Sequence, residues 1–326
     1  MADFTILVLP GAWAASVAST LDILRTAAQL APRHRLPRAT WRVVSPAPGA
    51  VALSGGMAVD AVPLPRRRGR DASTWIVPGL GLEQAAGIAP RLAADDARLA
   101  TRAVAAHVDG GGEVAASCSA VFLLQAAGLL RGRRVTTTWW LAPELRRLEP
   151  TCVVDADRMV CADGPVHTAG AAFAQVDLML HLLRTRFGVA LADAVGRVLL
   201  IDGRHAQAGF VVPTMLSNGN ALVARLVERI EEALPRPPSV EELAAGFAMS
   251  PRTLARHVQR ATGRSTMALI QTVRLSRARA LIESSRTSIE DVAAEVGYAD
   301  ATALRRLVRK VAGTNPSRYR SAGPRP

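Results

Sequence analysis

The sequence predicts two domains of different fold class: an N-terminal α/β domain with a doubly wound parallel sheet, and an all-α C-terminal domain with two helix-turn-helix motifs. Short apolar runs alternate with helical patterns over roughly the first 200 residues. One apolar pattern then occurs twice within roughly the last 90 residues. A proline-rich break at 235–238 separates the two regions, and 326 residues are enough for two domains.

The N-terminal region has the order of elements expected of a parallel sheet. Its apolar runs are short, as buried parallel strands are, and amphipathic stretches of helical period lie between them. Helices that connect parallel strands cover both faces of the sheet. The predicted strands are 4–9, 41–44, 74–77 and 113–117. The predicted helices are 16–30, 95–108, 119–130 and 170–187.

The C-terminal repeat has the apolar spacing of two successive helix-turn-helix motifs. Apolar residues at i, i+3, i+4 and i+7 give the first helix of each motif one buried face. In this helix Val240, Leu243, Ala244 and Phe247 correspond to Ile289, Val292, Ala293 and Val296. In the second helix Leu254, Arg256, Val258 and Gly263 correspond to Leu304, Arg306, Val308 and Gly313. The distance in sequence between corresponding residues increases by one at the turn and is otherwise constant. The pattern therefore indicates a repeated motif.

The residues between the paired helices have the chemistry of a tight turn and a helix start. Ser250 is a good N-cap, and Pro251 suits the first helical position. Asp300 is expected to cap the corresponding helix of the second motif. Gly297 supplies the backbone freedom that the turn before this helix requires.

The outward face of each second helix is rich in arginine. An α-helix fits the major groove of B-DNA, and guanidinium groups on it reach guanine edges or phosphates. We therefore predict DNA contacts from the side opposite the buried Leu254 and Leu304. The predicted contact residues are Arg252, Thr253, Arg256, Thr302, Arg305, Arg306 and Arg309.

Positive charge is concentrated in the same region. The formal net charge of the chain is +13. Residues 236–326 hold sixteen Lys and Arg against seven Asp and Glu, whereas residues 1–235 hold twenty-four against twenty. The alternative is a helical bundle with a solvated, arginine-coated surface. Because the charge coincides with the repeat, we favour a domain that binds double-stranded DNA at a promoter or operator.

Further signals are Ala293, Gly297 and Tyr298 in the second motif, the run GTNPSRYR at 313–320 and the segment 274–282 between the motifs. In these features residues 237–322 resemble the DNA-binding domain of the AraC/XylS family of bacterial transcription regulators, where a helix similar to 274–282 joins the two motifs. The aromatic residues usual in the second helices are replaced here by Val258, Leu304 and Val308. The resemblance implies recognition helices in successive major grooves, about one helical turn (~34 Å) apart.

Cys118 falls at a predicted strand-to-helix turn, where helix N–H groups point toward the side chain. Such a position lowers a thiol's pKa and makes it a candidate nucleophile. The informative segments around it are 77–79 (VPG), 118–124 (CSAVFLL), 136–139 (TTTW) and 168–170 (TAG). In these segments the chain resembles the DJ-1/PfpI group of the class I glutamine amidotransferase-like fold, over about residues 3–190. The resemblance implies a flavodoxin-like sheet, and fusion of this domain to a paired helix-turn-helix is a recurring regulator architecture.

The chain departs from the DJ-1/PfpI pattern where catalysis needs a base. Members that do chemistry pair the cysteine with a histidine just before the tryptophan of the TTTW segment, and this position is Thr138 here. Threonine has no base that titrates near neutral pH. His107 and His167 are the other candidate bases. We therefore predict no catalytic residue and no enzyme, with Cys118 as a weak candidate. The alternative is a cysteine hydrolase or amidase that uses Cys118.

A domain without catalysis is expected to bind a ligand at the carboxyl edge of its sheet. The predicted pocket residues are Gly79, Cys118, Ser119, Thr138 and Trp139. We expect a small-molecule effector and a homodimer, with RNA polymerase as a further candidate partner. Three cysteines without metal-ligand spacing predict a reduced, cytoplasmic protein with no metal, and no cofactor is predicted. No segment resembles a signal peptide or a membrane span, so no membrane partner is expected.

The predicted domain boundaries follow the breaks in these patterns. We expect the α/β domain at 1–190, a linker with helices at 191–236, the DNA-binding domain at 237–322 and a disordered tail at 323–326. One of the helices in the linker is expected at 221–234. Within the linker, 202–210 resembles the Arg-x-x-x-Gln segment of fused regulators. The basic cluster at 66–70 is interpreted as a solvated loop rather than a second DNA contact.

Overall fold

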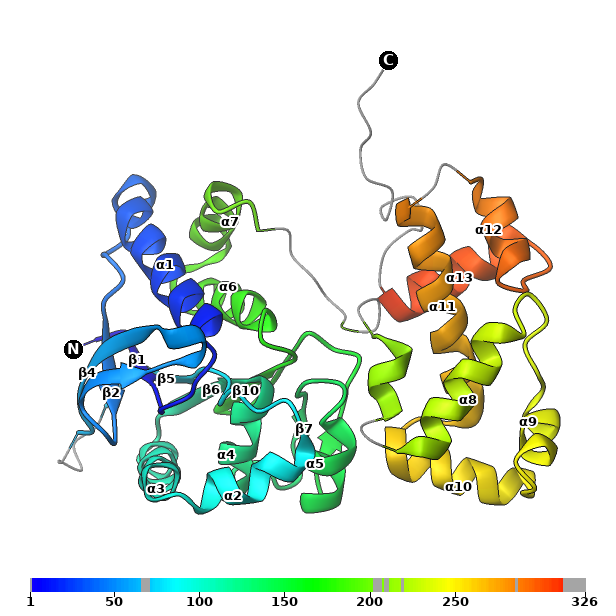
Figure 1. Ribbon diagram of the computed structural model, residues 1–326. Coiled ribbons are helices and arrows are strands. Elements are labelled where there is room, and N and C mark those ends of the chain that lie inside the picture. Colours follow the sequence, from blue (N-terminus) through cyan, green and yellow to red (C-terminus); the bar gives the residue numbers. More distant parts are fainter. Residues whose placement is uncertain are drawn as a thin grey trace. The chain divides into compact units, whose positions relative to one another are not determined.

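The computed structural model describes residues 2–65, 71–201, 207, 211–217, 220–284 and 287–312. The chain divides into two compact units, 1–204 and 205–326, each of which is described by itself (Figure 1). The basic cluster 66–70, the run 313–320, the tail 323–326 and most of 202–210 lie outside the described residues. The segment 191–236, expected to be a linker, is shared between the two units.

The first unit is built on a mostly parallel sheet, which confirms the predicted fold class. Its described strands follow the order β3-β4-β2-β1-β5-β6-β10-β9. Only the pairs β3–β4 and β9–β10 are antiparallel among them, and each lies at an edge of the sheet. The strands are β1 (Phe4–Leu7), β2 (Trp41–Ser45), β3 (Gly49–Ala52), β4 (Ala58–Pro63), β5 (Thr74–Val77), β6 (Glu113–Ser117), β9 (Val160–Asp163) and β10 (Val166–Ala169).

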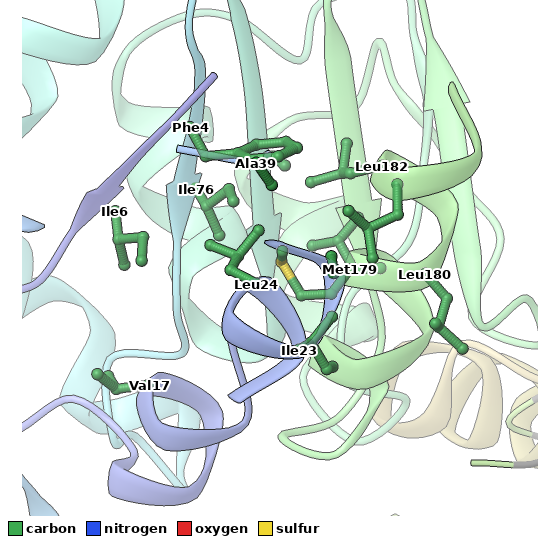
Figure 2. Packing of buried hydrophobic residues seen from close by; sticks show 14 of the residues in the cluster. Phe4, Ile6, Val17, Ile23, Leu24, Ala39, Ile76, Met179, Leu180 and Leu182 are labelled. Atoms are coloured by element: carbon green, nitrogen blue, oxygen red, sulfur yellow. The ribbon is translucent and has the colours of Figure 1, made fainter. Parts of the chain in front are cut away.

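Helices cover both faces of this sheet, because successive side chains of a strand point to opposite faces. On one face, Phe4, Ile6 and Ile76 pack against apolar residues of the covering helices, as Figure 2 shows. The helices on this face are α1 (Ala14–Leu30), α6 (Ala174–Phe187) and α7 (Val189–Val198). Those on the other face are α2 (Ile88–Ala93), α3 (Asp95–Asp109), α4 (Val121–Ala126) and α5 (Ala142–Leu148).

Two predicted helices of this unit are shorter in the structure. The helix expected at 119–130 is replaced by a single 3₁₀ turn, Cys118–Ala120, followed by α4, which ends at Ala126. Gly128 adopts a φ of 73° and terminates it. The helix expected at 170–187 begins only at Ala174. The strands β3, β4, β9 and β10 were not predicted, nor was the short parallel pair β7 (Arg134–Val135) and β8 (Val153–Val154).

The described part of the second unit is helical and contains the predicted repeat. The pairs α9–α10 and α12–α13 are its two helix-turn-helix motifs, and α11 joins them (Figure 1). Its α-helices are α8 (Ala221–Glu232), α9 (Val240–Gly246), α10 (Pro251–Thr262), α11 (Thr266–Ser284), α12 (Ile289–Glu295) and α13 (Ala301–Ala312). Within the described residues of the whole chain, none of the helices has the length and apolarity needed to span a membrane.

Candidate functional site

The first helix-turn-helix motif is fixed by local hydrogen bonds at each helix start. Ser239 and Glu242 form a capping box on α9, in which each side chain accepts from the other residue's backbone N–H, at 3.1 and 2.8 Å. Ser250 caps α10 by accepting from the backbone N–H of Thr253 at 3.2 Å. Pro251 is the first helical residue. The predicted cap and helix start are therefore confirmed.

Leu254 and Val258 determine which side of α10 faces solvent. Both are fully buried. With 3.6 residues per turn, the opposite side of the helix carries Arg252 and Arg256, and both are exposed. Thr253 is half-buried instead, and its hydroxyl lies 3.0 Å from that of Ser250. Thr253 is thus part of the helix cap and lies beside the outward face.

Two further polar residues of α10 share the outward face, and the sequence analysis missed both. Gln259 and Arg260 are exposed on the side opposite Leu254 and Val258. Arg260 follows Arg256 at the same i, i+4 spacing that links Arg256 to Arg252. This spacing could have identified Arg260 from the sequence.

The second motif repeats this construction. Ser288 caps α12 by accepting from the Asp291 N–H at 3.0 Å. Asp300 accepts from the backbone N–H of Ala303 at 2.9 Å, as predicted, and this hydrogen bond holds the pKa of Asp300 below its usual value. Leu304 and Val308 are fully buried. The exposed residues opposite them are Thr302, Arg306 and Arg309.

Arg305 differs from the other predicted DNA contacts. It lies at the side of α13, is half-buried, and donates to Glu290 of α12 at 2.9 Å. This guanidinium is therefore paired with a carboxylate of its own motif. We therefore assign Arg305 to the contact between the two helices and the outward face of α13 to Thr302, Arg306 and Arg309.

A set of contacts around Gly297 holds the turn of the second motif. Gly297 has a φ of 80°, and a Cβ atom there would lie 2.1 Å from the carbonyl oxygen of Pro235. Arg274 of α11 donates to the carbonyl oxygens of Val296 and Gly297, at 2.7 and 2.5 Å. Its guanidinium also stacks on Tyr298, 3.6 Å from the ring centroid. The sequence placed Arg274 in the joining helix but gave no sign of this role.

The elbow is the turn at which Cys118 follows β6 in the first unit. Cys118 has a φ of 55°, a left-handed conformation that non-glycine residues seldom adopt. Its N–H donates to Gly170 O at 2.7 Å, and its carbonyl oxygen accepts from Thr137 Oγ1 at 2.8 Å. A Cβ atom on Gly79 would lie 3.1 Å from Cys118 Cβ, so the two backbones approach closely. The predicted strand-to-helix turn is thus present.

The five residues predicted to line a pocket at the elbow are all buried. Ser119 Oγ accepts from the N–H of Leu80 at 3.0 Å, which ties the elbow to the loop that contains Gly79. Trp139 packs edge to face with Trp140 at 5.0 Å between ring centroids. The hydroxyl of Thr138 is buried without a hydrogen-bond partner among the described residues. The indole N–H of Trp13, whose ring reaches Gly79, shares this property.

The expected activation of Cys118 is wrong. Complete burial raises the pKa of this thiol to about 11, and hydrogen bonds with Ser119 offset only part of the effect. The helix that was expected to stabilise the thiolate begins only after the 3₁₀ turn and has six residues. Desolvation of the thiolate therefore outweighs the N–H groups near it.

Neither alternative histidine lies near the thiol. His107 stacks on Trp75 at 4.7 Å, and its Nε2 lies 3.1 Å from the carbonyl oxygen of Glu113. His167 Nε2 lies 3.9 Å from the Glu113 carboxylate. His107 lies at Glu113, which begins β6, and His167 pairs with Ala115 in the middle of β6, whereas Cys118 follows the end of that strand. Both histidines are wrong as candidate bases for Cys118.

The fold and these two sites define a two-domain protein: an α/β unit with a buried cysteine elbow, and a helical unit with paired helix-turn-helix motifs. Residues 243–322 match the family described as "Helix-turn-helix domain", and residues 75–185 match the DJ-1/PfpI family. The chain thus joins a segment that matches the DJ-1/PfpI family to a segment that matches a helix-turn-helix domain.

The chain is similar to proteins named as transcriptional regulators. It is 29% identical over 204 residues to "HTH-type transcriptional regulator GlxA" of Rhizobium meliloti, a match that covers 60% of this chain and 62% of that protein. It is 26% identical over 328 residues to "HTH-type transcriptional regulator CdhR" of Pseudomonas aeruginosa, which covers 99% of this chain and 92% of that protein. The match to GbdR of the same organism covers 59% of that protein, so the chain spans about three fifths of GlxA and of GbdR.

A solved structure supports the fold of the first unit. The crystal structure of an AraC family transcriptional regulator from Pseudomonas putida aligns with a TM-score of 0.50 and 19% identity. The alignment covers 61% of this chain and 100% of that one. At this identity the likeness concerns the fold alone.

Proposed function

We propose that this protein is a sequence-specific DNA-binding transcription regulator. The observation that carries the proposal is the paired outward face of α10 and α13, where Arg252, Arg256, Arg306 and Arg309 lie opposite buried leucines. Helices of this kind enter the major groove, and arginines on them contact guanine edges or phosphates. The named functions of GlxA and CdhR agree with this role.

We infer that the first unit is a sensor or dimerisation domain without catalysis. A thiol with a pKa near 11 and, among the described residues, no histidine beside it is a poor nucleophile at neutral pH. The buried Thr138 hydroxyl and Trp13 N–H near the elbow, which have no hydrogen-bond partner in the described part of the chain, are polar groups that a bound small molecule could satisfy. The proposed effector site comprises Gly79, Cys118, Ser119, Thr138 and Trp139. A cytoplasmic homodimer that contacts RNA polymerase completes the proposal.

Selection of bound duplexes from a random DNA library tests the DNA-binding role. We expect the full-length protein to enrich sequences with two conserved half-sites about 10 base pairs apart, because two motifs of one chain meet successive major grooves. Competition with unrelated DNA at fixed salt measures the specificity ratio. Recovery of random sequence alone would overturn the proposal.

The second candidate function is a cysteine hydrolase or amidase, and the strained backbone at Cys118 is the observation that favours it. We expect iodoacetamide to alkylate native Cys118 no faster than Cys152 or Cys161 at pH 7. Burial raises the pKa of all three thiols, to about 11 for Cys118 and Cys161. At pH 7 a thiol with that pKa is ionised in about one molecule in 10,000.

Peptide mass spectrometry after timed alkylation gives the three rates separately. Denaturant provides the control, because the three cysteines should then react alike. Selective modification of native Cys118, together with a hydrolytic turnover abolished by Cys118→Ala, would favour the hydrolase instead.

A further inference from the structure

The joining helix α11 supports the second motif. The buried apolar cluster of this motif includes Leu275, Ala278 and Ile282 of α11, which pack with residues of α12 and α13. α11 also packs against α10 of the first motif. Apolar attraction is not directional, so the angle of the second motif on α11 is fixed most sharply by directional contacts.

Arg274 of α11 makes such contacts with the turn of the second motif. Its guanidinium donates to two successive carbonyl oxygens, those of Val296 and Gly297, at 2.7 and 2.5 Å. These carbonyls follow the last residue of α12, where carbonyl oxygens have no helical partner. The N–H bonds of a guanidinium lie in its plane, whereas Tyr298 is met by its face, with the ring centroid 3.6 Å away. Because the three contacts act in different directions, together they fix the orientation of the turn on α11.

The first motif has an arginine at the equivalent place. Arg225 of α8 precedes Arg274 by 49 residues, the same distance in sequence that separates Val240 from Ile289. Its guanidinium lies over the ring of Phe247, the residue that ends α9, at 5.1 Å from the ring centroid. Each motif is thus preceded by a helix whose arginine meets an aromatic ring at the turn. The repeat therefore extends to α8 and α11.

The arginine before the second motif is bound more firmly than the one before the first. Arg274 is half-buried and combines two hydrogen bonds with its ring contact. Arg225 is exposed, and its guanidinium has no hydrogen-bond or ionic partner among the described residues. Removal of Arg274 would leave two carbonyl oxygens without their donor, which is the costlier loss. The second motif should therefore depend on its arginine more than the first does.

We propose that Arg274 is a positioning residue for DNA recognition, which holds the second motif at the angle on α11 that brings the outward face of α13 to its half-site. The inference rests on the proposed DNA-binding function. α13 follows the turn and has 12 residues, which span about 18 Å, so a rotation of about 15° at the turn moves its far end by about 5 Å. Arg274 acts through the turn and not on DNA.

Operators in which one half-site is scrambled test this role. The half-site read by the second motif is the one whose scrambling affects Arg306→Ala least. We expect Arg274→Ala to reduce discrimination against a scrambled second half-site by about tenfold or more, because a displaced α13 no longer reads the base pairs whose mismatch is costly. Discrimination at the first half-site should stay within about twofold of the wild type, since distant sites act independently.

Further variants relate the effect to the guanidinium. Arg274→Lys should lose most of the same discrimination, because an ammonium has no planar fork with which to bind two carbonyls and cover a ring. Tyr298→Phe keeps the ring and should behave like the wild type. Arg277→Ala, at an exposed arginine of the same helix, is the matched control and should keep discrimination at both half-sites. Arg225→Ala should lower discrimination at the first half-site only, and by less.

Hydrogen exchange separates positioning from folding. Amides of α12 and α13 should remain protected in both Arg274 variants, because the apolar cluster is intact. Loss of that protection, equal loss of discrimination at both half-sites, or wild-type discrimination in Arg274→Ala would overturn the proposal. A wild-type protein without sequence preference would contradict the proposed function as well, whereas the other three results contradict this inference alone.

Discussion

Alanine at Arg256 or at Arg306 is expected to weaken binding to the selected operator by about 1–3 kcal/mol each, which is roughly fivefold to more than a hundredfold. The two residues occupy equivalent positions in the repeat, and each lies opposite a fully buried leucine, Leu254 or Leu304. Neither side chain supports the core, so the loss should appear in DNA affinity while Tm stays unchanged. Fluorescence anisotropy with labelled operator measures it.

Arg305 provides the matched control, since it is the same residue type one position from Arg306. Because Glu290 holds its guanidinium, Arg305→Ala should change operator affinity much less. The salt dependence separates two ways in which Arg256 and Arg306 could act. Loss of a base contact relaxes specificity at one position of the operator. Loss of a phosphate contact weakens binding to all sequences alike and lowers the salt slope by about one. A larger loss in Arg305→Ala than in Arg306→Ala would show that the outward face of α13 is assigned incorrectly.

The sequence predicted the centre of the sheet and failed at its edges, for a physical reason. The predicted strands became β1, β2, β5 and β6, which are neighbours in the sheet. Their runs are apolar because both faces are covered. The strand β4, which lies next to the edge strand β3, is largely exposed and contains Asp60 and Pro63, so its residues carry no such signal. The strand β10 is buried but has only four residues, and its side chains include His167 and Thr168.

Within the candidate sites, local chemistry could be predicted and tertiary contacts could not. The caps at Ser250 and Asp300 and the turn at Gly297 depend on residues a few positions apart, and the structure confirms them. The pKa of Cys118 depends on how deeply neighbouring elements bury it, which its position at the turn does not reveal. The role of Arg274 likewise requires α11 to lie against the turn that contains Gly297.

Gly297→Ala is expected to destabilise the second motif by about 2–5 kcal/mol, since two costs combine. At a φ of 80° any L side chain is strained. The added Cβ would also meet the carbonyl oxygen of Pro235 at 2.1 Å, so the backbone of one segment must move. That movement separates the Val296 and Gly297 carbonyls from Arg274, which binds both. Operator affinity should fall with it, because α13 follows this turn.

Hydrogen exchange in the full-length protein measures this loss of stability within the second motif itself. Tryptophan fluorescence reports on the first unit and should not change, whereas amides of α12 and α13 should lose protection. Gly246→Ala is the matched control in the first motif: it lies in α9, and a Cβ there would meet nothing within 4 Å. Because alanine favours helix, that variant should keep or slightly raise protection. Wild-type protection and operator affinity in Gly297→Ala would mean that the Pro235–Gly297 contact does not hold the second motif in its DNA-binding form.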